Sequence, residues 1–124
     1  MSAALFPVLE SHDTGIDTTV DGKALSRASD FLERLALGAG VTPLTEFISV
    51  ESDDYGILEE AGMELPQTQW FSAADGLRTV RALVDAVRQA RESDGALLAD
   101  LLALENVLVQ ADEMHVRWHL TIDI

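Results

Sequence analysis

Two of the three histidines lie four residues apart near the C-terminus, in the segment HVRWHLTIDI that covers residues 115–124. On a helix, the spacing of His115 and His119 could hold one metal ion. The segment instead alternates apolar and polar residues, which indicates a half-buried strand. Four residues of strand span about 13 Å, and zinc needs three or four ligands. The segment therefore predicts no metal site, and no other feature of the sequence predicts a cofactor.

The polar face of this predicted strand carries Arg117, His119 and Thr121. Neighbours on one face of a strand lie about 6.6 Å apart, so these three side chains could line an anion-binding surface. The favoured interpretation is a solvent-exposed sheet face, because amphipathic antiparallel strands show this pattern without any function. The polar connection 12–22 could add further groups. The candidate binding patch therefore comprises Arg117, His119, Thr121, His12, Asp13 and Asp17.

The acidic residues of the 12–22 connection recur every fourth position, at Asp13, Asp17 and Asp21. Oxygen-rich loops of this kind can bind calcium or magnesium. Counted from Asp13, however, the third position of an EF-hand loop would be Gly15 and the twelfth would be Ala24. Because the spacing fails, side-chain turns and a helix N-cap at Asp21 are the simpler prediction.

Half of the basic residues lie in one predicted helix, where they flank its apolar face: Arg78, Arg81, Arg88 and Arg91. Arginine is suited to clamping a carboxylate or a phosphate. The favoured interpretation is ion pairing within an acid-rich protein, including the pair Arg81 and Asp85 one helical turn apart. Trp70 precedes this helix and is predicted to be partly exposed. It could anchor a partner, as exposed aromatic side chains often do, or equally act as a staple that fixes the entry of the chain into the helix. Trp70, Arg78 and Arg81 are the candidate partner-contact residues.

A search for catalytic signatures finds no GxSxG, no SxxK, no phosphate-binding loop and no dinucleotide-binding glycine pattern. The adjacent acids Asp53–Asp54 and Glu59–Glu60 have side chains that diverge, so neither pair resembles a catalytic dyad. No catalytic residue is assigned, and the sequence favours a protein that is not an enzyme.

The periodicity of apolar residues predicts the elements that would position these groups. The segment 3–11 reads as a strand in which Pro7 occupies an edge or an outward-facing position. A helix is predicted over 22–37, a short helix near 53–61, and an antiparallel helix pair over about 72–92 and 95–113. For 42–50 a short helix is favoured, with a strand as the alternative. The prediction is an α+β fold in which the N- and C-terminal strands pair in a small antiparallel sheet under a mostly helical layer.

Length, composition and charge limit the classes of function that the sequence supports. The 124 residues predict a single domain over 1–124, and 48% hydrophobic content is enough for a core. The chain contains no cysteine, which is typical of a reducing compartment. No run of about 18 apolar residues and no secretion signal is present, so a cytoplasmic location is predicted. The net charge of -14 disfavours nucleic-acid and membrane partners.

The stretches GIDTTVDGKAL, QWFSAADGLRTVRAL and VRWHLTIDI together resemble small acidic bacterial proteins of unknown function, and this resemblance covers most of the chain. It implies a bacterial, stand-alone domain. It assigns no catalytic or binding residue.

These observations favour a non-catalytic acidic interaction module, of an immunity or regulatory type, that binds a basic protein partner. The charge is uneven, since residues 1–64 contain 13 acids and 3 bases. The alternative is a small-molecule-binding protein or hydrolase with a pocket near His119, Arg117 and the 12–22 connection. Self-association as a homodimer through an edge of the small sheet is a third hypothesis.

Overall fold

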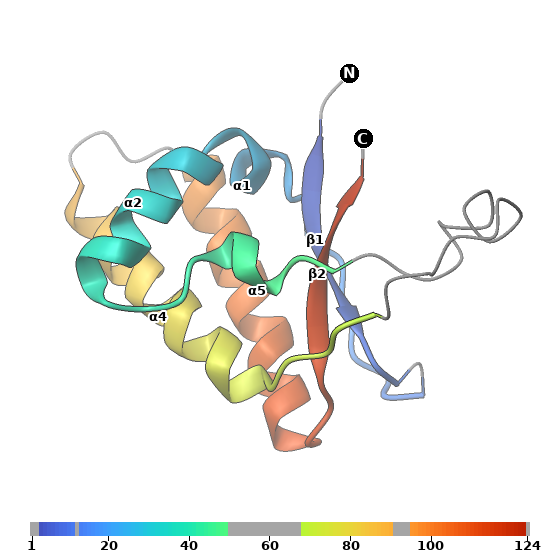
Figure 1. Cartoon of the computed structure of the whole chain (residues 1–124). Helices are drawn as coiled ribbons and strands as arrows, with labels where there is room; N and C mark the ends of the chain where they lie inside the picture. Colours follow the sequence, from blue (N-terminus) through green and yellow to red (C-terminus); the bar gives the residue numbers. More distant parts are fainter. Residues whose placement is uncertain (1–2, 12, 50–67, 91–94, 124) are drawn as a thin grey trace, which may run out of the picture.

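The computed structural model describes residues 3–11, 13–49, 68–90 and 95–123. Strands β1 (Ala4–Leu9) and β2 (Trp118–Asp123) form a two-stranded antiparallel sheet, which packs beside a layer of helices (Figure 1). The two strands come from opposite ends of the chain and lie side by side. The predicted α+β fold, with adjacent N- and C-terminal strands, is therefore confirmed.

The register of the sheet pairs Ala4 with Asp123 and Leu9 with Trp118. The backbone N–H of Glu10 continues this ladder by donating to the Arg117 carbonyl, at 2.9 Å. Alternation along β1 then directs the backbone groups of Leu5, Pro7 and Leu9 away from β2. Pro7 has no N–H to donate, so this outward position is where a strand tolerates it, as predicted.

The opposite edge of β2 is covered by two short segments from the middle of the chain. Ile48 forms an isolated parallel bridge with Leu120, and the Ser49 N–H donates to the Leu120 carbonyl at 2.9 Å. Phe71 forms an isolated antiparallel bridge with Trp118 through two backbone hydrogen bonds of 2.8 and 2.9 Å. Much of the hydrogen-bonding capacity of this edge is therefore already used.

The helical layer contains α1 (Lys23–Arg27), α2 (Ser29–Ala39), the 3-10 helix η1 (Leu44–Phe47), α4 (Ala73–Gln89) and α5 (Gly95–Glu113). Helices α4 and α5 run in opposite directions and pack along each other (Figure 1), which confirms the predicted antiparallel pair. The apolar stripe of α4 is buried, as its helical spacing requires: Leu77, Val80, Leu83, Val84 and Val87.

The helix predicted over 22–37 is two helices, since the chain breaks at Ala28 between α1 and α2. Nothing in the local sequence explains this break. The N-cap predicted at Asp21 is also wrong, because the N-cap of α1 is Gly22, whose φ is 75°. The Leu5 N–H donates to the Gly22 carbonyl at 3.0 Å, and a Cβ at Gly22 would lie 2.0 Å from the Leu5 carbonyl oxygen. Glycine is needed there because the backbone of β1 passes too close for a side chain.

The segment 42–50 contains features of both alternatives. Leu44–Phe47 form the short helix η1, and the chain then extends so that Ile48 bridges to β2. The helix predicted near 53–61 lies outside the described residues. The C-terminal strand begins at Trp118 rather than at His115, because α5 continues to Glu113 and His115 then adopts a φ of 57° in the turn that follows.

The buried apolar side chains form one cluster to which both strands and the helices contribute. Trp118 lies at its centre with no exposed surface, as the alternation predicted for it. The Trp118 indole packs directly on the backbone of α4 at Gly76, where a Cβ would come within 2.4 Å of the ring. Its Nε1 donates to the Ser72 carbonyl at 3.1 Å. Within the described part of the chain, no helix is long and apolar enough to cross a membrane.

Candidate functional site

The three polar residues predicted to share the outer face of the C-terminal strand have different environments. Arg117 precedes β2, is exposed, and forms an ion pair with Glu10 across the sheet. This hydrogen-bonded contact, and then the negative charge of Glu10, raise the pKa of the Arg117 guanidinium above its ordinary value. Thr121 is half-buried opposite Phe6. Arg117 is thus already engaged by a carboxylate of the protein.

His119 is completely buried, which differs from the exposed sheet face that the sequence favoured. Its Nδ1 lies 2.9 Å from the Leu120 carbonyl oxygen, and Trp70 packs on the imidazole with ring centroids 4.7 Å apart. Its Nε2 has no hydrogen-bond partner among the described residues. Trp70, predicted to be partly exposed, is half-buried against this ring. The histidine is therefore a packed side chain rather than part of a solvent-facing patch.

The 12–22 connection lies on the other side of β1 from β2. His12 falls outside the described residues, and Asp13 and Asp17 are exposed. Hydrogen bonds from the Thr19 hydroxyl, and then from its backbone N–H at 2.9 Å from the carboxylate, lower the pKa of Asp17. This is the side-chain turn that the sequence suggested. The connection and β1 line a groove of about 300 Å³ that includes neither Arg117 nor His119.

The arginines of α4 form fewer internal ion pairs than the sequence favoured. Arg81 pairs with Glu105 of α5 at 3.6 Å, instead of with Asp85 in its own helix. Arg78 and Arg88 are exposed and form no ion pair with another described residue. Arg91 lies outside the described residues. Arg78 is the candidate partner-contact residue that reaches a cavity.

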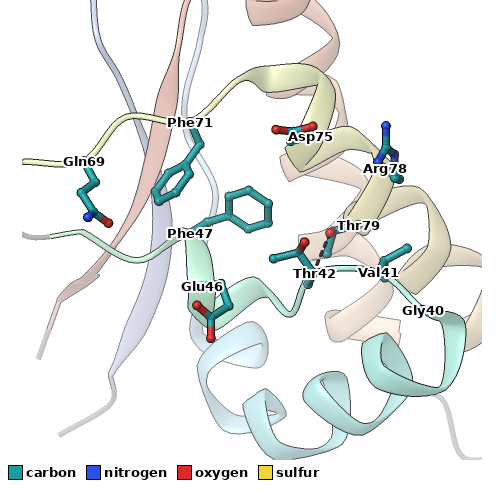
Figure 2. A pocket seen from close by; sticks show the side chains of 10 residues that line it. All are labelled: Gly40, Val41, Thr42, Glu46, Phe47, Gln69, Phe71, Asp75, Arg78 and Thr79. Carbon is teal, nitrogen blue, oxygen red and sulfur yellow. Dashed lines mark hydrogen bonds between the residues drawn. The ribbon is translucent and has the colours of Figure 1, made fainter.

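This cavity, of about 440 Å³, lies where four segments meet (Figure 2). The turn after α2, helix η1, the extended segment before α4 and the first two turns of α4 each contribute to its wall. The α2 turn is closed by backbone bonds from Gly40 to Leu37 and from Val41 to Ala36. The lining residues are Gly40, Val41, Thr42, Glu46, Phe47, Gln69, Phe71, Asp75, Arg78 and Thr79.

Phe47 and Phe71 form an aromatic wall on one side of the cavity, and this wall packs against the hydrophobic core. Phe47 contacts Phe71 edge to face, with ring centroids 5.2 Å apart at 81°. The other neighbour of Phe47 is Trp118, on which it stacks at 5.1 Å. Because Trp118 is fixed against α4, the two phenylalanines are fixed as well.

A part-buried hydrogen bond connects two of the segments on the far side of the cavity. The Thr79 hydroxyl donates to the Thr42 carbonyl at 2.7 Å, and thereby joins α4 to the chain that enters η1 (Figure 2). Thr79 itself is 1% exposed, whereas Thr42 is exposed, so the bond is partly shielded from water. A hydroxyl buried in this way is costly without a partner, so the bond fixes the spacing between α4 and the η1 segment.

Three charged side chains line the opening of the cavity without neutralising one another. Glu46 of η1, Asp75 of α4 and Arg78 of α4 are all exposed, and none forms an ion pair with another described residue. Gln69 adds an amide with both donor and acceptor capacity. The arrangement can bind a charged guest, because charged and polar groups lie around an opening that has an apolar wall, as in ligand pockets.

The cavity was missed from the sequence because its walls come from four separate segments. The Ser72 side chain accepts a hydrogen bond from the Asp75 N–H at 3.1 Å, so the spacing of these two residues signals a helix start and not a cavity. Arg78 was singled out for its residue type alone. No periodicity connects Glu46 or Gln69 to that helix, so no local signal could have joined them.

A smaller cavity of about 180 Å³ is lined by Ser72, Asp112, His115 and Arg117. It thus contains the residue types of a serine–histidine–aspartate triad. The Ser72 hydroxyl is used as the N-cap of α4, and no hydrogen bond joins it to His115. A nucleophile requires a base within hydrogen-bond reach, and Ser72 and His115 are not hydrogen-bonded in this structure. No group of three or more potential metal ligands is found among the described residues.

Comparisons of the chain with protein-family profiles, with curated proteins and with solved structures gave no significant match.

Proposed function

We propose that this protein is a non-catalytic binding module whose acidic surface engages a basic protein partner. The observation that carries the proposal is the unneutralised charge on its surface. Among the described residues only Glu10 and Glu105 are ion-paired, whereas other carboxylates lie exposed without a cationic partner: Asp13, Asp17, Asp21, Asp30, Glu33, Glu46, Asp75, Asp85, Asp112 and Glu113. A field of this sign attracts a basic surface and orients it before contact.

The partner would bind through complementary charge, and this protein would then cover the partner's own functional site. An immunity-type or regulatory role in a bacterial cytoplasm is the setting we propose. The cysteine-free sequence supports that setting, because it needs no oxidising compartment to fold.

The alternative function, a small-molecule site or hydrolase near His119, Arg117 and the 12–22 connection, has less support. His119 is packed under Trp70, Arg117 is paired with Glu10, and the connection opens on a different groove. A homodimer through the sheet edge is a secondary proposal. It has less support, because on the outer edge of β1 the Leu5 N–H already donates to the Gly22 carbonyl and Pro7 has no N–H to offer another strand.

The proposal is tested by affinity capture from a cell extract of the source organism. The bait is the wild-type chain, compared with a variant carrying Asp13→Asn, Asp17→Asn, Asp21→Asn and Asp30→Asn. We expect the wild-type chain to retain a basic protein that elutes as salt is raised, and the variant to retain much less. Retention of only neutral or acidic proteins, or equal retention by both baits, would contradict the proposal.

A further inference from the structure

The charged residues that line the cavity between η1 and α4 favour one kind of guest over another. Two carboxylates, Glu46 and Asp75, face it, against the single guanidinium of Arg78. Figure 2 shows Asp75 above the Phe47 ring and Glu46 on the far side of that ring from Asp75. The excess is one negative charge, in a molecule whose net charge is -14. A cationic guest is therefore favoured over an anionic one.

The aromatic wall indicates what kind of cation would fit. Phe71 is half-buried, so part of its ring faces the cavity, and Phe47 supports it edge to face. Aromatic faces attract guanidinium and ammonium groups, and they also pack against aliphatic stems. A cation carried on a flexible apolar stem would thus contact the wall along its length, while the carboxylates on either side of the Phe47 ring attract its charge.

The remaining polar groups suit a peptide backbone. The Arg78 guanidinium and the Gln69 amide are hydrogen-bond donors at the rim, and the carbonyl oxygens on either side of an inserted residue are acceptors. Arg78 would then bind the main chain of the guest, while Glu46 and Asp75 attract the charge of its side chain from either side of the Phe47 ring. This division of roles explains why the Arg78 guanidinium lies beside two carboxylates without forming an ion pair with either.

We propose that the η1–α4 cavity is the pocket in which the basic partner inserts an arginine or lysine side chain. The inference rests on the proposed function and specifies where that contact is made. The pocket is already formed in the free protein, because Trp118 fixes Phe47 and the Thr79–Thr42 hydrogen bond fixes the opposite wall. Little ordering of the protein is then needed on binding, which favours affinity.

The test uses a blocked tripeptide, acetyl-Gly-Arg-Gly-amide, titrated into the full chain labelled with nitrogen-15. The matched probe replaces arginine by citrulline, which has nearly the same shape and no charge. We expect the arginine peptide to shift the amide signals of Glu46, Phe71 and Asp75, and the citrulline peptide to bind at least about threefold more weakly, as loss of a partly exposed ion pair predicts.

Two variants locate the contact. Glu46→Gln and Asp75→Asn should each weaken the arginine peptide by about two- to fivefold, which is the range for a solvent-exposed ion pair. Asp85→Asn is the control, because Asp85 is exposed on the same helix but does not line the cavity. Denaturation curves of all three variants report whether each is folded at the temperature of the titration.

Equal affinity for the two peptides, signal shifts confined to residues outside the cavity, or unchanged binding by Glu46→Gln and Asp75→Asn would each overturn the inference. Those results leave the proposed function standing if the intact basic partner still binds in a charge-dependent manner. Failure of the proposed function is recognised separately, when no basic partner is retained by the wild-type chain.

Discussion

Gly76 lies so close to the Trp118 ring that no side chain fits between them. A methyl group there would enter the Trp118 ring, which is fully buried and also hydrogen-bonded to Ser72. We expect Gly76→Ala to lower the free energy of unfolding by about 1–3 kcal/mol, as overpacking does in other cores. Urea denaturation followed by tryptophan fluorescence measures the change.

Gly38→Ala is the matched control for this prediction. Gly38 is also helical, but a Cβ there meets nothing within 4 Å. The replacement should therefore stabilise the protein by up to about 1 kcal/mol, through helix propensity alone. Loss of stability in Gly38→Ala as large as that in Gly76→Ala would show that close approach to Trp118 is not the cause.

The hydrogen-bonded turn between Asp17 and Thr19 should make the stability of the protein depend on pH. The folded pKa of Asp17 is lowered from its ordinary value of 3.8 by hydrogen bonds from Thr19. A lowered folded pKa means that the turn contributes stability fully at pH above the unfolded value, and that this contribution is lost as the pH falls through the folded value.

Asp17→Asn should accordingly be less stable than the wild type near neutral pH, and the difference should shrink as the pH falls below about 4. Thermal unfolding at a series of pH values measures it, with Asp13→Asn as the control because Asp13 is an exposed acid in the same connection. A difference that persists unchanged into acid would contradict the assignment of the turn.

At the scale of elements, α4 is positioned by its first turn, which also forms part of the cavity wall. The Ser72 side chain caps this helix by accepting a hydrogen bond from the Asp75 N–H. Ser72→Ala should lower the free energy of unfolding by about 1 kcal/mol, because one backbone donor of the helix end no longer has a side-chain acceptor. Ser72→Asp retains an N-capping oxygen and should stay close to wild-type stability. Equal losses in both variants would contradict the capping role.

Helices and strands could be predicted from the sequence where the spacing of apolar residues within one segment defines them. Repeats of apolar residues at helical spacing identified α4 and α5, and alternation identified Trp118 and Leu120 as core residues. Tertiary contacts decided the rest. Gly22 caps α1 because β1 lies against it, and His119 is buried because Trp70 packs on its ring. The cavity was beyond sequence analysis for the same reason, since its groups meet only after four segments have packed.

At the scale of the whole molecule, the unpaired surface carboxylates repel one another. Added salt should therefore stabilise the folded chain, because the screening length falls from about 10 Å at 0.1 M to about 3 Å at 1 M. Urea denaturation at about 50 mM and about 500 mM potassium chloride measures this, because the screening length falls about threefold between these concentrations. A fall in the free energy of unfolding at the higher salt would contradict the account of the surface.

The most direct test of the acidic-module proposal is the association rate of the captured basic partner as a function of salt. Stopped-flow mixing gives this rate for the wild-type chain and for the variant with four neutralised aspartates. We predict that the wild-type rate falls at least about tenfold between about 50 mM and about 500 mM salt, and that the variant starts lower and falls less, as expected for electrostatic steering. Association rates that are equal for the two chains and independent of salt would contradict the proposed function.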